Sequence, residues 1–327
     1  MNSISRYQLA AMLIITDVFG LFCLSVSISL MTLYGLLSAA AMQFLLSLIS
    51  VLHGGRSAKW QHIIYLLYAV FCGGAVFASL WRTSGVIYIP YEDRNGIWGR
   101  LLTAGLIALV CLYSSSTGLR AVSRAAVIAA AAGLLCIIID FASAAFTADW
   151  ENLFRPEKQG FFYGFARGFA VSGGLGSFFV LLEKTRGERS RAAVLYFGAK
   201  AVLTAVIVLT SLAVAGGIVS VTEFPVITAA QLSQPFEAQR IDSLFLVIFI
   251  SFAAFSVTLQ VMTGAYLLKR IFPEFSRWRS CTMTVLILGA ALLISGRELI
   301  MARAAAAAAV LIVSAAAKNP LKNSADK

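Results

Sequence analysis

The chain is a succession of long apolar stretches, and its charged residues gather in the short gaps between them. Ten stretches can be placed, each near the ~20 residues that a helix needs to cross a bilayer core. They cover residues 7–29, 31–52, 62–84, 99–115, 121–146, 161–183, 192–220, 242–268, 279–296 and 299–317. Because the stretches are near-continuous rather than alternating, they predict helices and exclude a β-barrel. We therefore expect an all-α polytopic membrane protein with about ten transmembrane helices.

Composition agrees with this pattern. The 327 residues are 60% hydrophobic and 13% charged, whereas a soluble domain is about 25% charged. A chain this apolar would lack a water-facing surface in the cytosol. We expect one integral membrane domain over residues 1–327, in which 318–327 form a short basic tail.

Basic residues are unevenly shared between alternate loops. With a cytoplasmic N-terminus, the inner loops and the adjoining ends of the stretches hold sixteen Lys and Arg residues, and their outer counterparts hold seven; Arg167, Lys200 and Arg303 fall further inside stretches. By the positive-inside rule, both termini are predicted to be cytoplasmic. The net charge of +11 then lies mainly on the inner face, where it meets anionic membrane lipid. No nucleic-acid partner is expected.

The sequence offers little for catalysis or metal binding. Five cysteines show no metal-ligand spacing, and the only histidines are His53 and His62. No HExxH, Walker loop or nucleophile arrangement is present in the sequence. We expect no catalytic residue, no metal and no cofactor, and we do not expect an enzyme.

Two stretches contain residues that should interrupt a helix near mid-membrane. In the first, the interruption comprises Thr16, Asp17 and Gly20; in the sixth, it comprises Ser172, Gly173, Gly174, Gly176 and Ser177. Local unwinding is favoured over close packing as the reason for the glycines. The two stretches are five apart and so run in opposite directions, which is typical of a five-plus-five inverted repeat. The repeats would be about 1–148 and 160–317, and these eight residues are the candidate ligand-binding set.

Several segments together resemble a known family. They are ISRYQL at 4–9, TGLRAVSRAA at 117–126, DWENLFRP at 149–156, FP at 224–225 and RIDSLF at 240–245. In this order and spacing they resemble the spore germination permeases, the B-type subunits of germinant receptors, within the amino acid–polyamine–organocation transporters. The resemblance implies a five-plus-five repeat, a site between the first and sixth spans, companion receptor subunits and residence in the cell or spore inner membrane.

Charges inside the membrane are the strongest single-residue candidates, because an ionisable group in hydrocarbon is costly. Asp17 lies roughly 15 Å into its stretch. Two functional roles are expected: Asp17 binds the ammonium of an amino acid or amine, or it carries a coupling proton. The structural alternative is an ion pair with Arg167 or Lys200.

Four further residues are candidates for gating or ion coupling. Arg167 is expected to gate the outer pathway, to pair with an acidic group or to extend to the headgroups. Lys200 is expected to be a fixed cation in place of a coupling ion, as the resemblance implies, or a structural partner. Ser256 and Thr258 resemble ion- or substrate-facing hydroxyls of the wider superfamily, although such groups often bond their own helix.

Two functions remain open at this point. The first is a receptor subunit that binds a small germinant, an amino acid or amine, and passes a conformational change to its partners. The second is a permease for an amino acid or amine, proton-coupled or uncoupled. Both use one fold and one site, so that only the transport of ligand distinguishes them.

Overall fold

The computed structural model describes residues 3–24, 28–53, 59–87, 97–154, 160–216, 218, 222–232, 242–274, 278–294 and 299–316. In chain order the helices are α1 (Arg6–Phe22), α2 (Leu30–His53), α3 (Lys59–Ile87), α4 (Ile97–Thr117), α5 (Leu119–Thr147), the 3₁₀ helix η2 (Trp150–Phe154), α6 (Phe161–Val171), α7 (Leu175–Leu182), α8 (Arg189–Ala215), α9 (Pro225–Leu232), α10 (Asp242–Ile271), α11 (Arg279–Ile294) and α12 (Ile300–Ala315). The expectation of a helical protein is confirmed.

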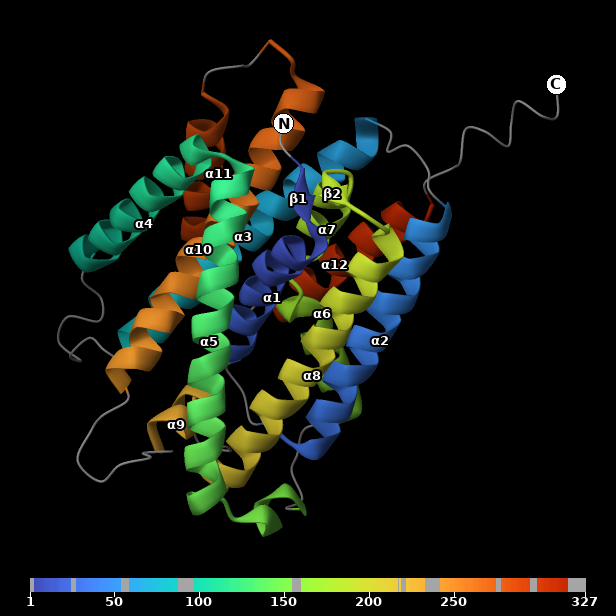
Figure 1. Cartoon of the computed structure of the whole chain (residues 1–327). Helices are drawn as coiled ribbons and strands as arrows, with labels where there is room; N and C mark the ends of the chain where they lie inside the picture. Colours follow the sequence, from blue (N-terminus) through green and yellow to red (C-terminus); the bar gives the residue numbers. More distant parts are fainter. Residues whose placement is uncertain are drawn as a thin grey trace.

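One small sheet was not predicted. Strands β1 (Ile4–Ser5) and β2 (Thr185–Arg186) form a two-residue parallel pair, with Ile4 opposite Thr185 and Ser5 opposite Arg186. The pair ties the start of α1 to the turn that follows α7 and lies in the upper part of Figure 1. Short pairings between distant segments leave no period in the sequence, and this one therefore escaped prediction.

Five of the described helices are long and apolar enough to cross a membrane. They are Leu30–Leu52, Lys59–Thr83, Leu119–Ile139, Arg189–Ala215 and Phe245–Ile271, and the bent pair α6–α7 gives a sixth. The apolar helices Thr103–Thr117, Arg279–Ile294 and Ile300–Ala315 are shorter. Large apolar side chains such as Leu67, Ile128 and Leu293 are exposed on the outside, as lipid-facing residues are in a membrane protein.

The predicted interruption of the first helix at Thr16–Gly20 is wrong. Helix α1 runs unbroken to Phe22, and Cys23 is its C-cap. The Thr16 hydroxyl bonds within the helix, to the Met12 carbonyl at 3.1 Å, and the Asp17 carboxylate finds its partners on other helices. Polar side chains thus disturb this helix less than the sequence suggested, because each is satisfied without freeing a backbone group.

The predicted break in the sixth span is confirmed. Helices α6 and α7 meet at a bend of 45° across Ser172–Gly174. The break lies in the interior of the bundle, against α1, α2 and α3 (Figure 1). It places a short unwound segment at the centre of the molecule.

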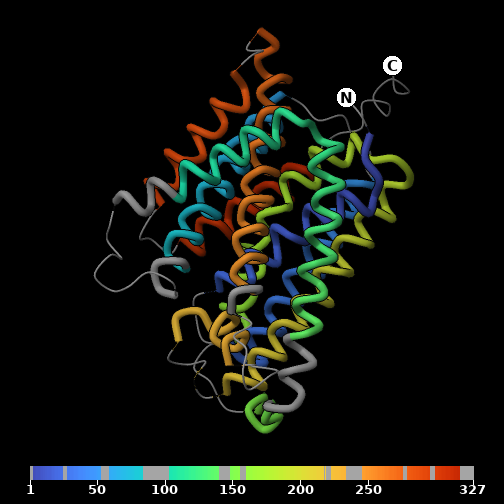
Figure 2. Tube along the Cα trace, turned by 60° about the vertical axis from the view of Figure 1, so that its left-hand side comes forward, coloured from blue at the N-terminus to red at the C-terminus, as the bar shows by residue number. Residues whose placement is uncertain are grey.

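The helices pack around α1, which contacts α5, α8 and α10. On one side of the bundle α2 packs along α6 and α8; on the other, α3 packs along α10 and α11. Figure 2 shows α10 running down from the upper end of the bundle, with α9 and η2 near the lower end. The β1–β2 pair lies toward the upper end of the molecule, and α9 and η2 lie at the lower end (Figure 1).

Small residues allow the closest helix contact. A Cβ on Gly164 of α6 would lie 2.3 Å from the Thr32 carbonyl oxygen, and one on Gly35 of α2 would lie 2.3 Å from the Phe161 carbonyl oxygen. Both distances are too short for any carbon atom, so the two backbones can meet only where both residues are glycine. This small-residue contact is the usual way in which membrane helices approach closely.

We predict that Gly164→Ala destabilises the protein by about 1–3 kcal/mol, because the added methyl must push α2 away from α6. Gly198→Ala is the matched control: it lies in α8 with open space around its Cβ position and should be neutral or mildly stabilising. Thermal unfolding in detergent would measure both. Equal midpoints for the two variants would contradict the close contact.

Candidate functional site

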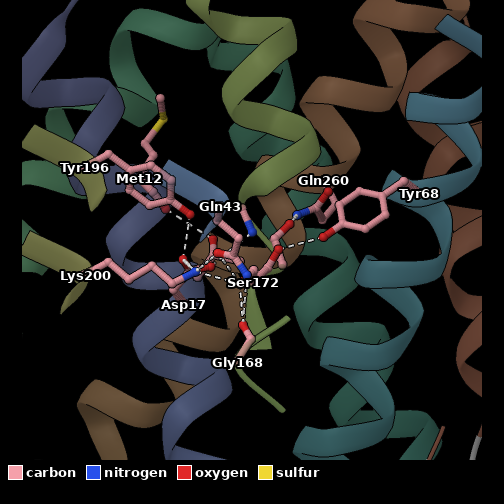
Figure 3. A network of polar contacts seen from close by, with 12 residues as sticks. Met12, Asp17, Gln43, Tyr68, Gly168, Ser172, Tyr196, Lys200 and Gln260 are labelled. Atoms are coloured by element: carbon pink, nitrogen blue, oxygen red, sulfur yellow. Dashed lines mark hydrogen bonds and ion pairs between the residues drawn. The ribbon is translucent and has the colours of Figure 1, made fainter. Parts of the chain in front are cut away.

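The candidate site is a buried polar network around the break in α6–α7 (Figure 3). Asp17 of α1 lies at its centre, and only 2% of this residue is exposed. Its Oδ1 accepts the Gly174 backbone N–H at 3.2 Å. Its Oδ2 accepts the Tyr196 hydroxyl at 2.6 Å and lies 2.9 Å from Lys200 Nζ. Three donors from the break and from α8 therefore surround one carboxylate.

Lys200 supplies the compensating charge. Besides Asp17, its Nζ donates to Gln43 Oε1 at 3.0 Å and to Ser172 Oγ at 2.6 Å. An ammonium has three N–H donors, and here each one has an oxygen acceptor. The side chain is 6% exposed, so the charge is stabilised by these three oxygens rather than by water.

Side chains from three helices bond backbone groups of the unwound segment. The Tyr68 hydroxyl of α3 donates to the Ser172 carbonyl at 2.6 Å. Gln260 Nε2 of α10 donates to the Gly173 carbonyl at 2.9 Å. With Asp17 on the Gly174 N–H, helices α1, α3 and α10 each satisfy one group of the break. In a membrane interior these bonds matter, because an unsatisfied backbone group costs several kcal/mol there.

A second layer closes around Ser172. Its hydroxyl lies 2.6 Å from the Gly168 carbonyl and 2.9 Å from Gln43 Oε1. Gln43 Nε2 of α2 also donates to the Gly168 carbonyl, at 3.2 Å. The last turn of α6 is thus held to α2 and, through Lys200, to α8.

The glycines of the break are required for close approach rather than for an unusual backbone. The glycines with positive φ among the described residues are Gly118, Gly187 and Gly216, none of them in the break. A Cβ on Gly174 would meet Leu13 at 3.2 Å, and one on Gly176 would meet the Tyr68 ring at 2.5 Å. Packing and unwinding, weighed as alternatives from the sequence, therefore occur together.

The remaining members of the predicted binding set lie at the edges of this network. Gly20 faces the Val171 carbonyl, where a Cβ would come within 2.9 Å. Thr16 bonds its own helix, and its methyl group lies against Gly173. Ser177 lies 2.9 Å from the Thr263 hydroxyl of α10.

The four residues predicted for gating or ion coupling do not lie together in the structure. Lys200 is part of the network, and its pairing with Asp17 matches one of the alternatives expected from the sequence. Arg167 lies instead over the Tyr163 ring, 4.7 Å from its centroid. Ser256 donates to the Phe252 carbonyl of its own helix, and Thr258 lies 3.4 Å from Cys111 Sγ. These two hydroxyls do not reach the break.

Sequence reasoning missed Gln43 and Tyr196 and did not assign Gln260 or Tyr68 to the break. Both glutamines are fully buried, and a glutamine inside an apolar stretch is itself a signal of an interhelical hydrogen bond. Tyr196 carries no such signal, because tyrosine is common at membrane interfaces.

A cavity of about 80 Å³ lies beside the network. It opens between the carboxyl ends of α1 and α6, the face of α3 and the start of α12. Its lining includes Gly20 and Cys23 from α1, Val171 from α6, and three arginines, Arg82, Arg167 and Arg303. Gly20 and Val171 join the cavity to the network, since Val171 immediately precedes the break.

The contacts of the network hold α1, α8 and the break in one arrangement. The Asp17 carboxylate and the Lys200 ammonium satisfy each other and the break, so an external ammonium would reach Asp17 only by displacing Lys200. Among the described residues no group of three His, Cys, Asp or Glu is placed to hold a metal ion. No family model matches this chain, and no curated protein matches it.

We predict that the effects of substituting Asp17 and Lys200 on stability are strongly coupled. Asp17→Asn and Lys200→Met should each destabilise the protein by about 3–5 kcal/mol, because each leaves a buried charge without its partner. The double variant should lose much less than the two single losses together.

Unfolding midpoints of the two single variants and the double variant, measured in detergent, would show how far the stability losses depart from additivity. Glu188→Gln is the control, since its ion pair with Arg191 is well exposed and contributes little. Simple additivity of the two core variants would contradict a coupled pair.

Proposed function

We propose that this chain is the membrane-embedded B-type subunit of a spore germinant receptor, which binds a small germinant, an amino acid or amine, within an amino-acid-transporter-like fold. The observation that carries the proposal is the break between α6 and α7 with a cavity at its edge. An interrupted helix beside a cavity, deep in a helical membrane protein, is typical of small-molecule sites in such folds. The resemblance noted from the sequence supplies the family.

The proposal includes ten spans in a five-plus-five inverted repeat, with α6–α7, α8, α10, α11 and α12 as the counterparts of α1 to α5. Helix packing supports it. The α1–α5 contact has its counterpart in α6–α12, α1–α8 in α6–α2, and α3–α11 in α10–α4. Likewise α2–α12 corresponds to α8–α5, and α5–α10 to α12–α3. Interchanging the two halves therefore exchanges these contacts in pairs, which supports a pseudo-two-fold axis, whereas α10–α11 and α4–α5 have no comparably extensive counterpart.

The proposal also includes cytoplasmic termini and residence in the cell or spore inner membrane. Arg6 and the basic run Lys184, Arg186, Arg189 and Arg191 belong to the end of the bundle marked by β1 and β2 (Figure 1). The opposite end carries η2 and α9. A basic end of this kind supports a cytoplasmic position.

Ligand binding would act through the ends of α1 and α6. Both helices contribute to the cavity wall, and both are tied to the break, α1 by Asp17 and α6 by Ser172. A ligand that binds one arrangement of these ends better than another shifts the population of the two. The Asp17–Lys200 pair would transmit that shift to α8, and from there to companion subunits.

A permease is the alternative function. The same central break favours it, because transporters often bind their substrate at a broken helix near the middle of the membrane, between the inward-open and outward-open states. Labelled amino acid in sealed vesicles separates the two functions: a permease accumulates or exchanges the label, whereas a receptor binds it without moving it. The proposal includes no catalytic reaction, cofactor or metal.

We predict that deleting the gene in its source organism gives spores that fail to respond to at least one amino acid or amine germinant. The wild-type gene should restore the response, and Lys200→Met should not, because that variant leaves Asp17 without its partner. Loss of optical density of a spore suspension measures germination. Normal responses to every germinant, or a source organism that forms no spores, would contradict the receptor function.

A further inference from the structure

The cavity beside the break is lined by an unusual concentration of positive charge. Arg82 comes from α3, Arg167 from α6 and Arg303 from the first turn of α12. No aspartate or glutamate is among the described residues that line it. The remaining lining is small or apolar, including Gly20, Ala75 and Ala170. Fixed cations in a small apolar enclosure attract an anion more strongly than they would in water.

The three arginines differ in the contacts that their guanidinium groups already make. Arg82 Nε lies 2.6 Å from Glu223 Oε1, in a half-exposed pair. The Arg167 guanidinium lies over the Tyr163 ring, which occupies the face of its plane. The Nε of Arg303 is buried and has no hydrogen-bond partner in the described structure. A buried donor without an acceptor destabilises the protein, and a bound oxygen acceptor would remove that destabilisation.

The start of α12 also favours an anion in the cavity. Leu299 and Ile300, its N-cap and first residue, also line the cavity. Leu299 provides no side-chain cap, and the first turn has no acidic residue. The free N–H groups of a helix start carry a partial positive charge, which adds to that of Arg303 in the same turn.

An ammonium has no comparable partner here. The Glu223 carboxylate beside the cavity is paired with Arg82 at 2.6 Å, and the Asp17 carboxylate at the break is paired with Lys200 at 2.9 Å. A ligand amine would have to displace a lysine that has three oxygen acceptors. A ligand carboxylate would meet an arginine with a donor to spare, and arginine binds carboxylates through paired hydrogen bonds.

We propose that the arginine-lined cavity binds the carboxylate of a small ligand, and that Arg303 is its principal contact. This narrows the proposed function, on which it rests: the germinant is an amino acid or another small carboxylate, and not a simple amine. A volume of about 80 Å³ has room for roughly five to eight water molecules. That space suits a ligand of the size of alanine or valine.

Two matched sets of small molecules test the proposal on the full-length protein in detergent. The first is L-alanine, propionate and ethylamine; the second is L-valine, isovalerate and isobutylamine. Within each set the compounds differ by the loss of the amine or of the carboxylate. Each is added at about 50 mM and equal ionic strength, enough to saturate a site with a Kd of about 1 mM, and the unfolding midpoint is measured.

We expect the amino acid and the carboxylate of at least one set to raise the midpoint, and the amine of that set to leave it unchanged. Arg303→Gln should weaken the carboxylate effect about tenfold in apparent Kd, the loss of one charge-assisted contact. Arg303→Lys should weaken it less, because the charge remains. Arg270→Gln is the control: its ion pair with Glu183 lies outside the cavity, and affinity should not change.

Three results would overturn the proposal: a shift with amines but not carboxylates, a carboxylate shift that Arg303→Gln leaves intact, or no shift with any of the six compounds. The wild-type comparison stands even if a variant fails to fold. The outcome is also separable from the receptor function. Spores that respond through this protein to an amine would refute the carboxylate site alone, whereas carboxylate binding with normal germination of deletion spores would refute the receptor alone.

Discussion

The ion pair between Asp17 and Lys200 is the interaction on which the centre of this protein depends. It joins α1 to α8 at 2.9 Å with both side chains buried, and it reaches the break in α6–α7 from both partners. Asp17 holds the Gly174 N–H, and Lys200 holds the Ser172 hydroxyl. Without either charge the other would be buried without compensation, so the pair and the break stabilise each other.

The rest of the network follows from the need to satisfy backbone groups where water is absent. Interrupting a helix frees N–H and C=O groups that lipid cannot bond. Tyr68 and Gln260 bond the freed carbonyls from α3 and α10. The break is therefore a meeting point for helices from both halves of the sequence. A ligand that moved the end of α6 would act on all of these contacts at once.

The sequence predicted the helices, the break at Ser172–Gly174 and, as one alternative, a buried ion pair of Asp17, because hydropathy and intramembrane charge are local signals. It left the partner of Asp17 open between Arg167 and Lys200. Which helix faces meet is decided by packing between distant segments, and hydropathy carries no record of it. For the same reason the sequence-based prediction wrongly interrupted α1 at Thr16–Gly20 and missed the β1–β2 pair.

The central claim is that Asp17 is an ionised carboxylate held by Lys200 in the ligand-free protein. Isotope-edited infrared spectroscopy tests it most directly, on protein with ¹³C-labelled aspartate in liposomes at neutral pH. The difference spectrum between wild type and Asp17→Asn should contain the two stretching bands of a carboxylate. A single carbonyl band of a protonated acid in that difference spectrum would contradict the ion pair, and with it the account of how the broken helix is held.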